Sequence, residues 1–215
     1  MAPQIKQIGT QGITNITPLD GSCEWYWGTD YTGGDMYEAE ELFKQGHPVD
    51  RNRLVLIHYP DGKLIQAVAE KGQYFGCPIF YNNKIITLMA DFINEAIKIM
   101  QLDALSGQST LIAAIPLSDV EDCYNLMLKA SPLMLTRQGN DNKFQVLWPE
   151  RAEFDIGNTE SFCFKNGEYL YFSAWYEDPD YREEAIVRKS GTGEIIDRIP
   201  GSMWAMPDGQ MWVLT

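Results

Sequence analysis

The sequence has few of the residues that carry most enzymatic chemistry. Only two histidines occur in 215 residues, and there is no Gly-x-Ser-x-Gly elbow or glycine-rich phosphate loop. Cys23, Cys77, Cys123 and Cys163 form no Cys-x-x-Cys pair and have no nearby histidine, which excludes the common zinc patterns. We therefore predict no metal and no cofactor, and we expect the thiols to be free and mostly buried.

Positive charge is also scarce, because 17 Lys and Arg residues face 30 Asp and Glu residues, for a net charge of −13. Phosphate binding needs clustered Lys and Arg, so we expect no nucleic-acid partner and no anionic membrane surface as a partner. Long hydrophobic runs are missing, and residues 1–6 lack the apolar core of a signal peptide. These absences predict a cytoplasmic protein, unless a signal peptide has been removed.

What the sequence does contain is a succession of short, alternating strands separated by turns. The clearest case is Asn166-Gly167 between 161–165 and 169–175, because Asn-Gly tolerates the positive φ angles of a two-residue hairpin turn. Similar strand–turn–strand patterns recur along the chain. Hairpins of this first kind are predicted over 13–27, 78–89, 124–136, 161–175 and 203–214.

A second kind of hairpin follows each of the first four. These hairpins are predicted over 54–68, 96–115, 143–156 and 185–199. Their turns, marked by Gly62, Gly107, Glu150 and Gly193, are separated by 45, 43 and 43 residues. A fixed period of this size, with four strands in each unit, is typical of β-propeller blades.

The pattern therefore predicts an all-β fold, a five-bladed β-propeller formed by one domain over residues 1–215. The fifth unit has only its first hairpin, so we expect residues 4–8 to supply a missing strand. One blade would then be closed by both chain termini, which removes exposed sheet edges. The alternatives are a β-sandwich or a mixed α+β domain.

Two segments also have helical spacing. We interpret residues 91–100 as a turn and a strand, because the repeat requires a strand there. We interpret residues 37–44 as a short helix within a long insertion loop, 28–52, in the first repeat.

The hairpin pattern resembles β-propeller repeats, and in size it is most similar to small five-bladed ones. That group includes sugar-binding lectins and several glycosidase families. The resemblance covers nearly the whole chain, but it is architectural. The sequence has no Gly-His…Trp-Asp signature, kelch pattern or repeated sugar-binding motif, so no functional residues are carried over from a family.

Acidic and aromatic residues gather in the loops that would share one face of such a propeller. Aromatic faces suit sugar rings and ammonium groups. The main hypothesis is a non-catalytic binding or scaffold module for an unknown small molecule, saccharide or basic peptide. The alternative interpretation is that these loops are simply solvated. The candidate ligand-binding residues are Asp30, Tyr31, Asp35, Tyr37, Glu38, Tyr176, Glu177 and Asp178.

Catalysis has weaker support in the sequence. Asp122 and Glu160 would begin the innermost strands of adjacent blades, where two carboxylates could act as the pair that a glycosidase requires. A carbohydrate-active hydrolase and a sugar-binding lectin are therefore the alternative functions. The sequence does not decide between them, and it leaves the ligand and the oligomeric state open.

Overall fold

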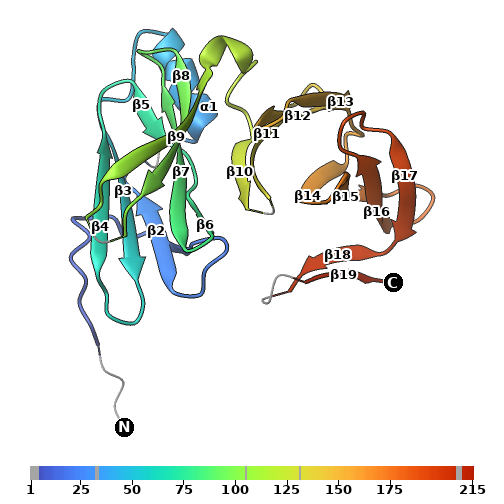
Figure 1. Ribbon diagram of the computed structural model, residues 1–215, viewed down its shortest axis with the longest axis horizontal. Helices are drawn as coiled ribbons and strands as arrows, with labels where there is room; N and C mark the ends of the chain where they lie inside the picture. The colour runs from blue at the N-terminus through green and yellow to red at the C-terminus, as the bar shows by residue number, and fades with distance from the viewer. Residues whose placement is uncertain (1–4, 32–33, 105, 131, 207–209) are drawn as a thin grey trace. The chain divides into compact units, whose positions relative to one another are not determined.

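The computed structural model describes residues 5–31, 34–104, 106–130, 132–206 and 210–215 (Figure 1). The chain divides into two compact units, Met1–Cys123 and Tyr124–Thr215, called here the first and second unit. Both consist mainly of antiparallel sheets, which confirms the predicted all-β class. None of the helices in the described residues is long and apolar enough to cross a membrane.

The first unit contains two sheets that share one hydrophobic core. The first sheet has the order β1-β2-β3-β4, and the second has the order β5-β7-β8-β9 with β6 also paired to β7. Leu54 and Leu56 of the first sheet and Ile85 and Leu102 of the second are buried in this common cluster. The strands are β1 (Thr17–Pro18), β2 (Trp25–Thr29), β3 (Asn52–His58), β4 (Leu64–Ala69), β5 (Gln73–Phe75), β6 (Ile79–Tyr81), β7 (Lys84–Asp91), β8 (Ala96–Leu102) and β9 (Ser109–Pro116), followed by a short 3-10 helix, η1 (Leu117–Asp119).

The single α-helix of the described residues, α1 (Met36–Lys44), lies in the connection between β2 and β3, as predicted. Met36 and Ala39 are buried, and the Phe43 ring lies 5.4 Å from that of Phe92, centroid to centroid. Phe92 belongs to the tight turn that joins β7 to β8. The prediction of a turn and a strand over 91–100 is therefore confirmed, because Asp91 pairs with Ala96 across that turn.

The second unit contains two four-stranded sheets, β10-β11-β12-β13 and β14-β15-β16-β17, and a two-stranded sheet, β18-β19. The aromatic rings of Phe144, Phe162 and Phe172 form the centre of its core, with centroids 4.8–5.4 Å apart. The strands are β10 (Leu126–Ala130), β11 (Leu133–Gln138), β12 (Lys143–Trp148), β13 (Ala152–Asp155), β14 (Glu160–Asn166), β15 (Tyr169–Tyr176), β16 (Arg182–Lys189), β17 (Ile195–Pro200), β18 (Ser202–Ala205) and β19 (Met211–Leu214).

Every hairpin predicted from the sequence is present as an antiparallel pair. The first kind corresponds to β1–β2, β6–β7, β10–β11, β14–β15 and β18–β19. The second kind corresponds to β3–β4, β8–β9, β12–β13 and β16–β17. Parts of the predicted turns, Ser131 and 207–209, lie outside the described residues.

Two sequence-based expectations have different outcomes. Residues 5–8 belong to no strand, and the Lys6 ammonium donates to the Asp61 carbonyl in the β3–β4 turn; Gln4 lies outside the described residues. Closure of a ring by the two termini therefore stays a prediction. The expectation of mostly buried thiols is wrong, because only Cys123 is buried, while Cys23 and Cys77 lie exposed in connections and Cys163 is half-buried.

Candidate functional site

Asp30, the first predicted ligand residue, is held by its neighbour across the β2–β3 ladder. Thr29 pairs with Leu54, so residues 30 and 53 face each other beyond the end of β2. The Arg53 backbone N–H donates to Asp30 Oδ1 and its Nε donates to Oδ2, both at 2.6 Å. Burial raises the pKa of Asp30, but these bonds outweigh burial and leave the pKa below its ordinary value. The Asp30 carboxylate therefore holds the start of the loop after β2 against Arg53 at the start of β3.

Asp35 and Glu38 form the N-terminal cap of α1. Asp35 Oδ1 accepts hydrogen bonds from the N–H groups of Tyr37 (2.7 Å) and Glu38 (3.3 Å), and Glu38 Oε2 accepts from the Asp35 N–H (2.8 Å). This is a reciprocal capping box, which satisfies N–H groups that the helix itself leaves unpaired. These two carboxylates start the helix.

The tyrosines of the same loop pack onto the unit. The Tyr31 ring meets the Tyr74 ring edge-on, with centroids 5.0 Å apart, and the Tyr74 hydroxyl donates to the Gly34 carbonyl at 3.1 Å. Tyr37 is half-buried on α1. The structure thus brings the five predicted residues of the first unit into one loop, where Asp30, Tyr31, Asp35 and Glu38 make the structural contacts described above.

The other predicted ligand residues lie in the second unit: Tyr176 ends β15, and Glu177 and Asp178 follow it in the connection to β16. The guanidinium of Arg182 stands 4.5 Å from the Tyr176 ring centroid, and Arg198 donates to the Tyr176 hydroxyl at 3.1 Å. Arg182 also donates to the Asp178 carbonyl at 2.7 Å, while the side chains of Glu177 and Asp178 are exposed. The aromatic face that we expected to meet a ligand is therefore in contact with an arginine of the same chain.

Glu160, one of the two weak catalytic candidates, belongs to a buried ion pair with Arg188. Arg188 donates to Oε1 at 2.8 Å and to Oε2 at 3.0 Å, and the Gly157 N–H also donates to Oε1 at 3.0 Å. The two side chains are only 5% and 8% exposed. Asp122, the other candidate, is half-exposed in the first unit. The Glu160 geometry is that of a structural ion pair.

A different place in the second unit has the form of a small binding site. A hollow of about 200 Å³ lies between β10, β11 and β14. Its polar lining consists of Asn125, Lys129, Thr136, Gln138 and Ser161. Its apolar lining consists of Met127, Phe144 and Phe162. Ligand pockets typically combine such apolar walls with a few polar groups.

The lining of this hollow is fixed by hydrogen bonds from Gln138 to β14 and by hydrogen bonds within the β10–β11 hairpin. The Gln138 side chain donates to the Glu160 carbonyl at 2.6 Å and accepts from the Phe162 N–H at 3.1 Å. The Thr136 hydroxyl donates to the Met127 carbonyl at 3.3 Å, and Asn125 Nδ2 donates to the Gln138 carbonyl at 3.3 Å. Groups held in this way are already in position before a ligand arrives, which lowers the entropic cost of binding.

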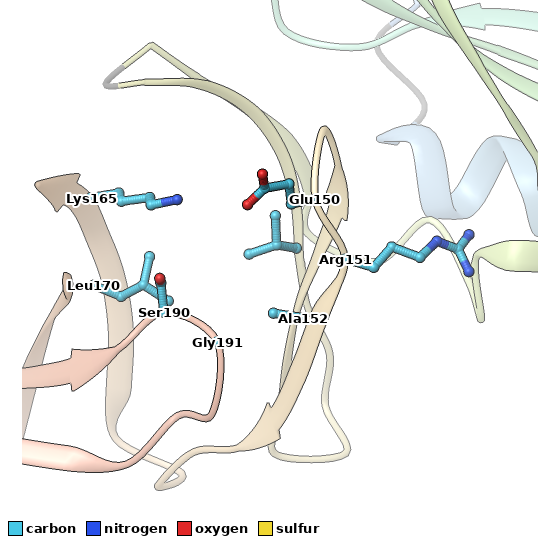
Figure 2. A pocket seen from close by; sticks show the side chains of 8 residues that line it. Glu150, Arg151, Ala152, Lys165, Leu170, Ser190 and Gly191 are labelled. Carbon is cyan, nitrogen blue, oxygen red and sulfur yellow. The ribbon is translucent and has the colours of Figure 1, made fainter. Parts of the chain in front are cut away.

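A second hollow, of about 60 Å³, lies near the turns of the second unit (Figure 2). Lys165 and Glu150 point toward each other across it, whereas Arg151 is directed away. A space of this size has room for ordered water and not for a sugar ring. We therefore regard the hollow between β10, β11 and β14 as the candidate site.

Sequence reasoning missed this hollow. Alternation along β10 places Met127 and Lys129 on the same side of the strand, but it does not say which neighbouring element faces them. In the part of the chain that the structure describes, no group of three or more His, Cys, Asp or Glu residues could hold a metal ion.

Comparison with known proteins adds no assignment. No protein-family model matches the chain, and no curated protein matches it.

Proposed function

We propose that this chain is a non-catalytic binding module that holds a small hydroxylated ring, a monosaccharide unit, in the hollow between β10, β11 and β14. The observation that carries the proposal is the lining of that hollow, where hydroxyl, amide and ammonium groups stand beside Met127 and Phe162. Sugars present hydroxyl groups at the ring edge and C–H groups on the ring face, so both kinds of lining have a role.

The size of the hollow supports a ligand with one ring. Its volume of about 200 Å³ is below the roughly 300–1,000 Å³ of pockets for drug-sized ligands. The acidic loop of the first unit is the less favoured site, since Asp30, Asp35 and Glu38 already serve its own folding. A hydrolase with Glu160 is less favoured because both of its oxygens accept bonds from Arg188.

The binding proposal is tested by filling the hollow. Ser161 is exposed on β14, so Ser161→Phe should place a ring in the hollow without disturbing the core. We expect saturation-transfer NMR with a panel of neutral and N-acetylated hexoses to detect binding to the wild type, and Ser161→Phe to weaken it by roughly tenfold or more. The matched control is Ser109→Phe, at an exposed position on β9, which should bind like the wild type.

A third variant separates this site from the acidic loop. If Tyr37→Ala loses sugar binding while Ser161→Phe retains it, the ligand site is the loop that contains α1. If no sugar of the panel binds to the wild type, the proposed function is wrong.

We also propose that the five sheets are the blades of one closed propeller. Three of the sheets support this proposal, because each has four strands in sequence order. In a fourth sheet, β5 and β6 both pair with β7 and together take the place of its first strand. The fifth sheet, β18-β19, has two strands. Residues 4–8 would add a strand to it, which would cover an edge near the exposed side chains of Trp212 and Leu214.

Hydrogen exchange measures this closure directly. If residues 4–8 pair with the fifth sheet, their amide hydrogens should exchange slowly, and deleting residues 1–8 should accelerate exchange in 211–214. The control region is β16, whose exchange should not change on deletion. Fast exchange of residues 4–8 in the intact chain would contradict the closed ring.

A further inference from the structure

We infer that the second hollow, the one near the turns of the second unit, binds the zwitterion of a small amino acid such as glycine or alanine. This inference concerns a different place from the proposed saccharide site and does not depend on it. It is carried by two side chains of opposite charge, Lys165 and Glu150, which point toward each other across the hollow (Figure 2).

The two charged side chains come from different sheets. Glu150 is an exposed residue of the turn between β12 and β13, and Lys165 is a half-buried residue of β14. Within the part of the chain that the structure describes, neither side chain forms an ion pair or a hydrogen bond. Arg151 also lines the hollow, but its side chain is directed away from it. The hollow therefore presents one positive and one negative group, too far apart to neutralise each other.

A pair of separated charges suits a ligand that carries both charges itself. Ser190 lines the same side of the hollow as Lys165, and a serine hydroxyl can donate to a carboxylate (Figure 2). The carboxylate of an amino acid would lie at Lys165 and Ser190, and its ammonium group would lie at Glu150. A simple anion or a simple cation would be attracted by one of the two charged side chains and repelled by the other.

The size of the hollow limits the ligand to the smallest amino acids. At about 10–15 Å³ for each water-sized group, its volume of about 60 Å³ holds roughly four to six such groups. Glycine and alanine fit this space, and a long side chain does not. The apolar part of the lining, formed by Val146, Ala152 and Leu170, gives the methyl group of alanine a wall to pack against.

The exposure of the charged groups sets the strength of binding. Glu150 is exposed and Lys165 is only half-buried, so each ion pair with the ligand is weakened by water. We therefore expect a dissociation constant for glycine on the order of 10 mM at low salt. Binding should weaken as salt is added, because salt screens exposed charges.

The first test titrates the full chain with glycine, alanine, leucine, acetate and glycinamide, and follows the backbone amide signals of Ser190 and Gly191 by NMR. Alanine should bind within about threefold of glycine, and leucine should bind roughly tenfold or more weakly because its side chain exceeds the hollow. Acetate lacks the ammonium group and glycinamide lacks the carboxylate. Each should bind about three- to fivefold more weakly than glycine.

The second test assigns the binding to this hollow. Lys165→Met and Glu150→Gln each remove one charge, and each should weaken glycine binding by about three- to fivefold. The matched controls are Lys189→Met and Glu194→Gln, which remove exposed charges that do not line the hollow. Both controls should bind glycine like the wild type. The comparison of ligands uses the wild type alone, so it remains a test even if one variant fails to fold.

Several outcomes would overturn the inference. One is the absence of glycine binding to the wild type, and another is glycine binding that Lys165→Met and Glu150→Gln leave unchanged. Acetate or glycinamide binding as tightly as glycine would show recognition of a single charge. Equal affinity for leucine and glycine would show that the ligand is not confined by the hollow. None of these results bears on the saccharide site between β10, β11 and β14, so the two proposals fail separately.

Discussion

Glu160→Ala is expected to lower the free energy of unfolding of the second unit by roughly 3–5 kcal/mol, because it leaves a buried guanidinium without its counter-charge. Arg188 is 8% exposed and gives two hydrogen bonds to the Glu160 carboxylate. Its remaining bond, to the Gly193 carbonyl at 2.7 Å, does not neutralise it. Urea denaturation followed by circular dichroism measures the loss.

Two further variants identify the cause. Glu153→Ala breaks the exposed pair with Lys143, whose Nζ lies 2.9 Å from Glu153 Oε1, and should cost about 1 kcal/mol or less. The double variant Glu160→Leu with Arg188→Met removes both charges and should recover much of the lost stability. If Glu160→Ala costs no more than Glu153→Ala, the pair does not stabilise the second unit.

The sequence does not distinguish a catalytic role of Glu160 from its structural pairing with Arg188. A carboxylate at the start of a predicted inner strand is compatible with either role. Arg188 follows 28 residues later, on β16, and β15 lies between the two strands. The residues next to Glu160 in the sequence do not reveal Arg188 as its partner. The two side chains meet only because both extend across the same face of β15, which lies between their strands.

The hairpins were predictable because their signals are local. Alternating apolar residues and turn residues such as Asn166-Gly167 act within a few positions, and the observed ladders follow them. The role of Asp35 as the N-cap of α1 could also be predicted, since Asp-x-x-Glu at the start of a helical segment is a capping-box pattern. Asp35 and Glu38 also give the loop its acidic character, which is why the sequence indicates a ligand site there as well.

The hollow could not be predicted in the same way. It forms where β10 and β11 of one sheet meet β14 of the next, and Gln138 joins them by two hydrogen bonds. Local patterns predict the strands and the side on which Lys129 lies. They do not predict how two consecutive sheets pack, which depends on the volumes of buried rings such as Phe144 and Phe162.

The turn between β7 and β8 contains the second feature with a large expected effect. The carboxylate of Asp91 is fully buried, and it accepts hydrogen bonds from Lys98 Nζ (2.6 Å), Asn94 Nδ2 (2.9 Å) and Gln73 Nε2 (3.0 Å). The Asn94 N–H donates to the other oxygen at 3.1 Å. One side chain thus joins β5, β7, β8 and their turn.

Asp91→Asn is therefore expected to lower the free energy of unfolding of the first unit by about 2–3 kcal/mol at pH 7. The asparagine side chain has no negative charge, and only one of its two terminal atoms accepts hydrogen bonds. Urea denaturation at pH 7 measures the difference. The control is Asp50→Asn, which alters an exposed pair with Lys71 and should change stability by less than about 1 kcal/mol.

The pH dependence gives a second, independent measurement of Asp91. Burial raises its pKa, but the bonds from Lys98 and Asn94 outweigh burial, so the pKa in the folded protein lies below the ordinary value. The stability from this carboxylate is then fully present above the unfolded pKa of about 4 and is lost as the pH falls through the folded pKa. The gap between wild type and Asp91→Asn should therefore be constant from pH 7 to 5 and narrow below pH 4. A gap that stays constant or widens down to pH 3 would show that Asp91 does not titrate as the structure requires.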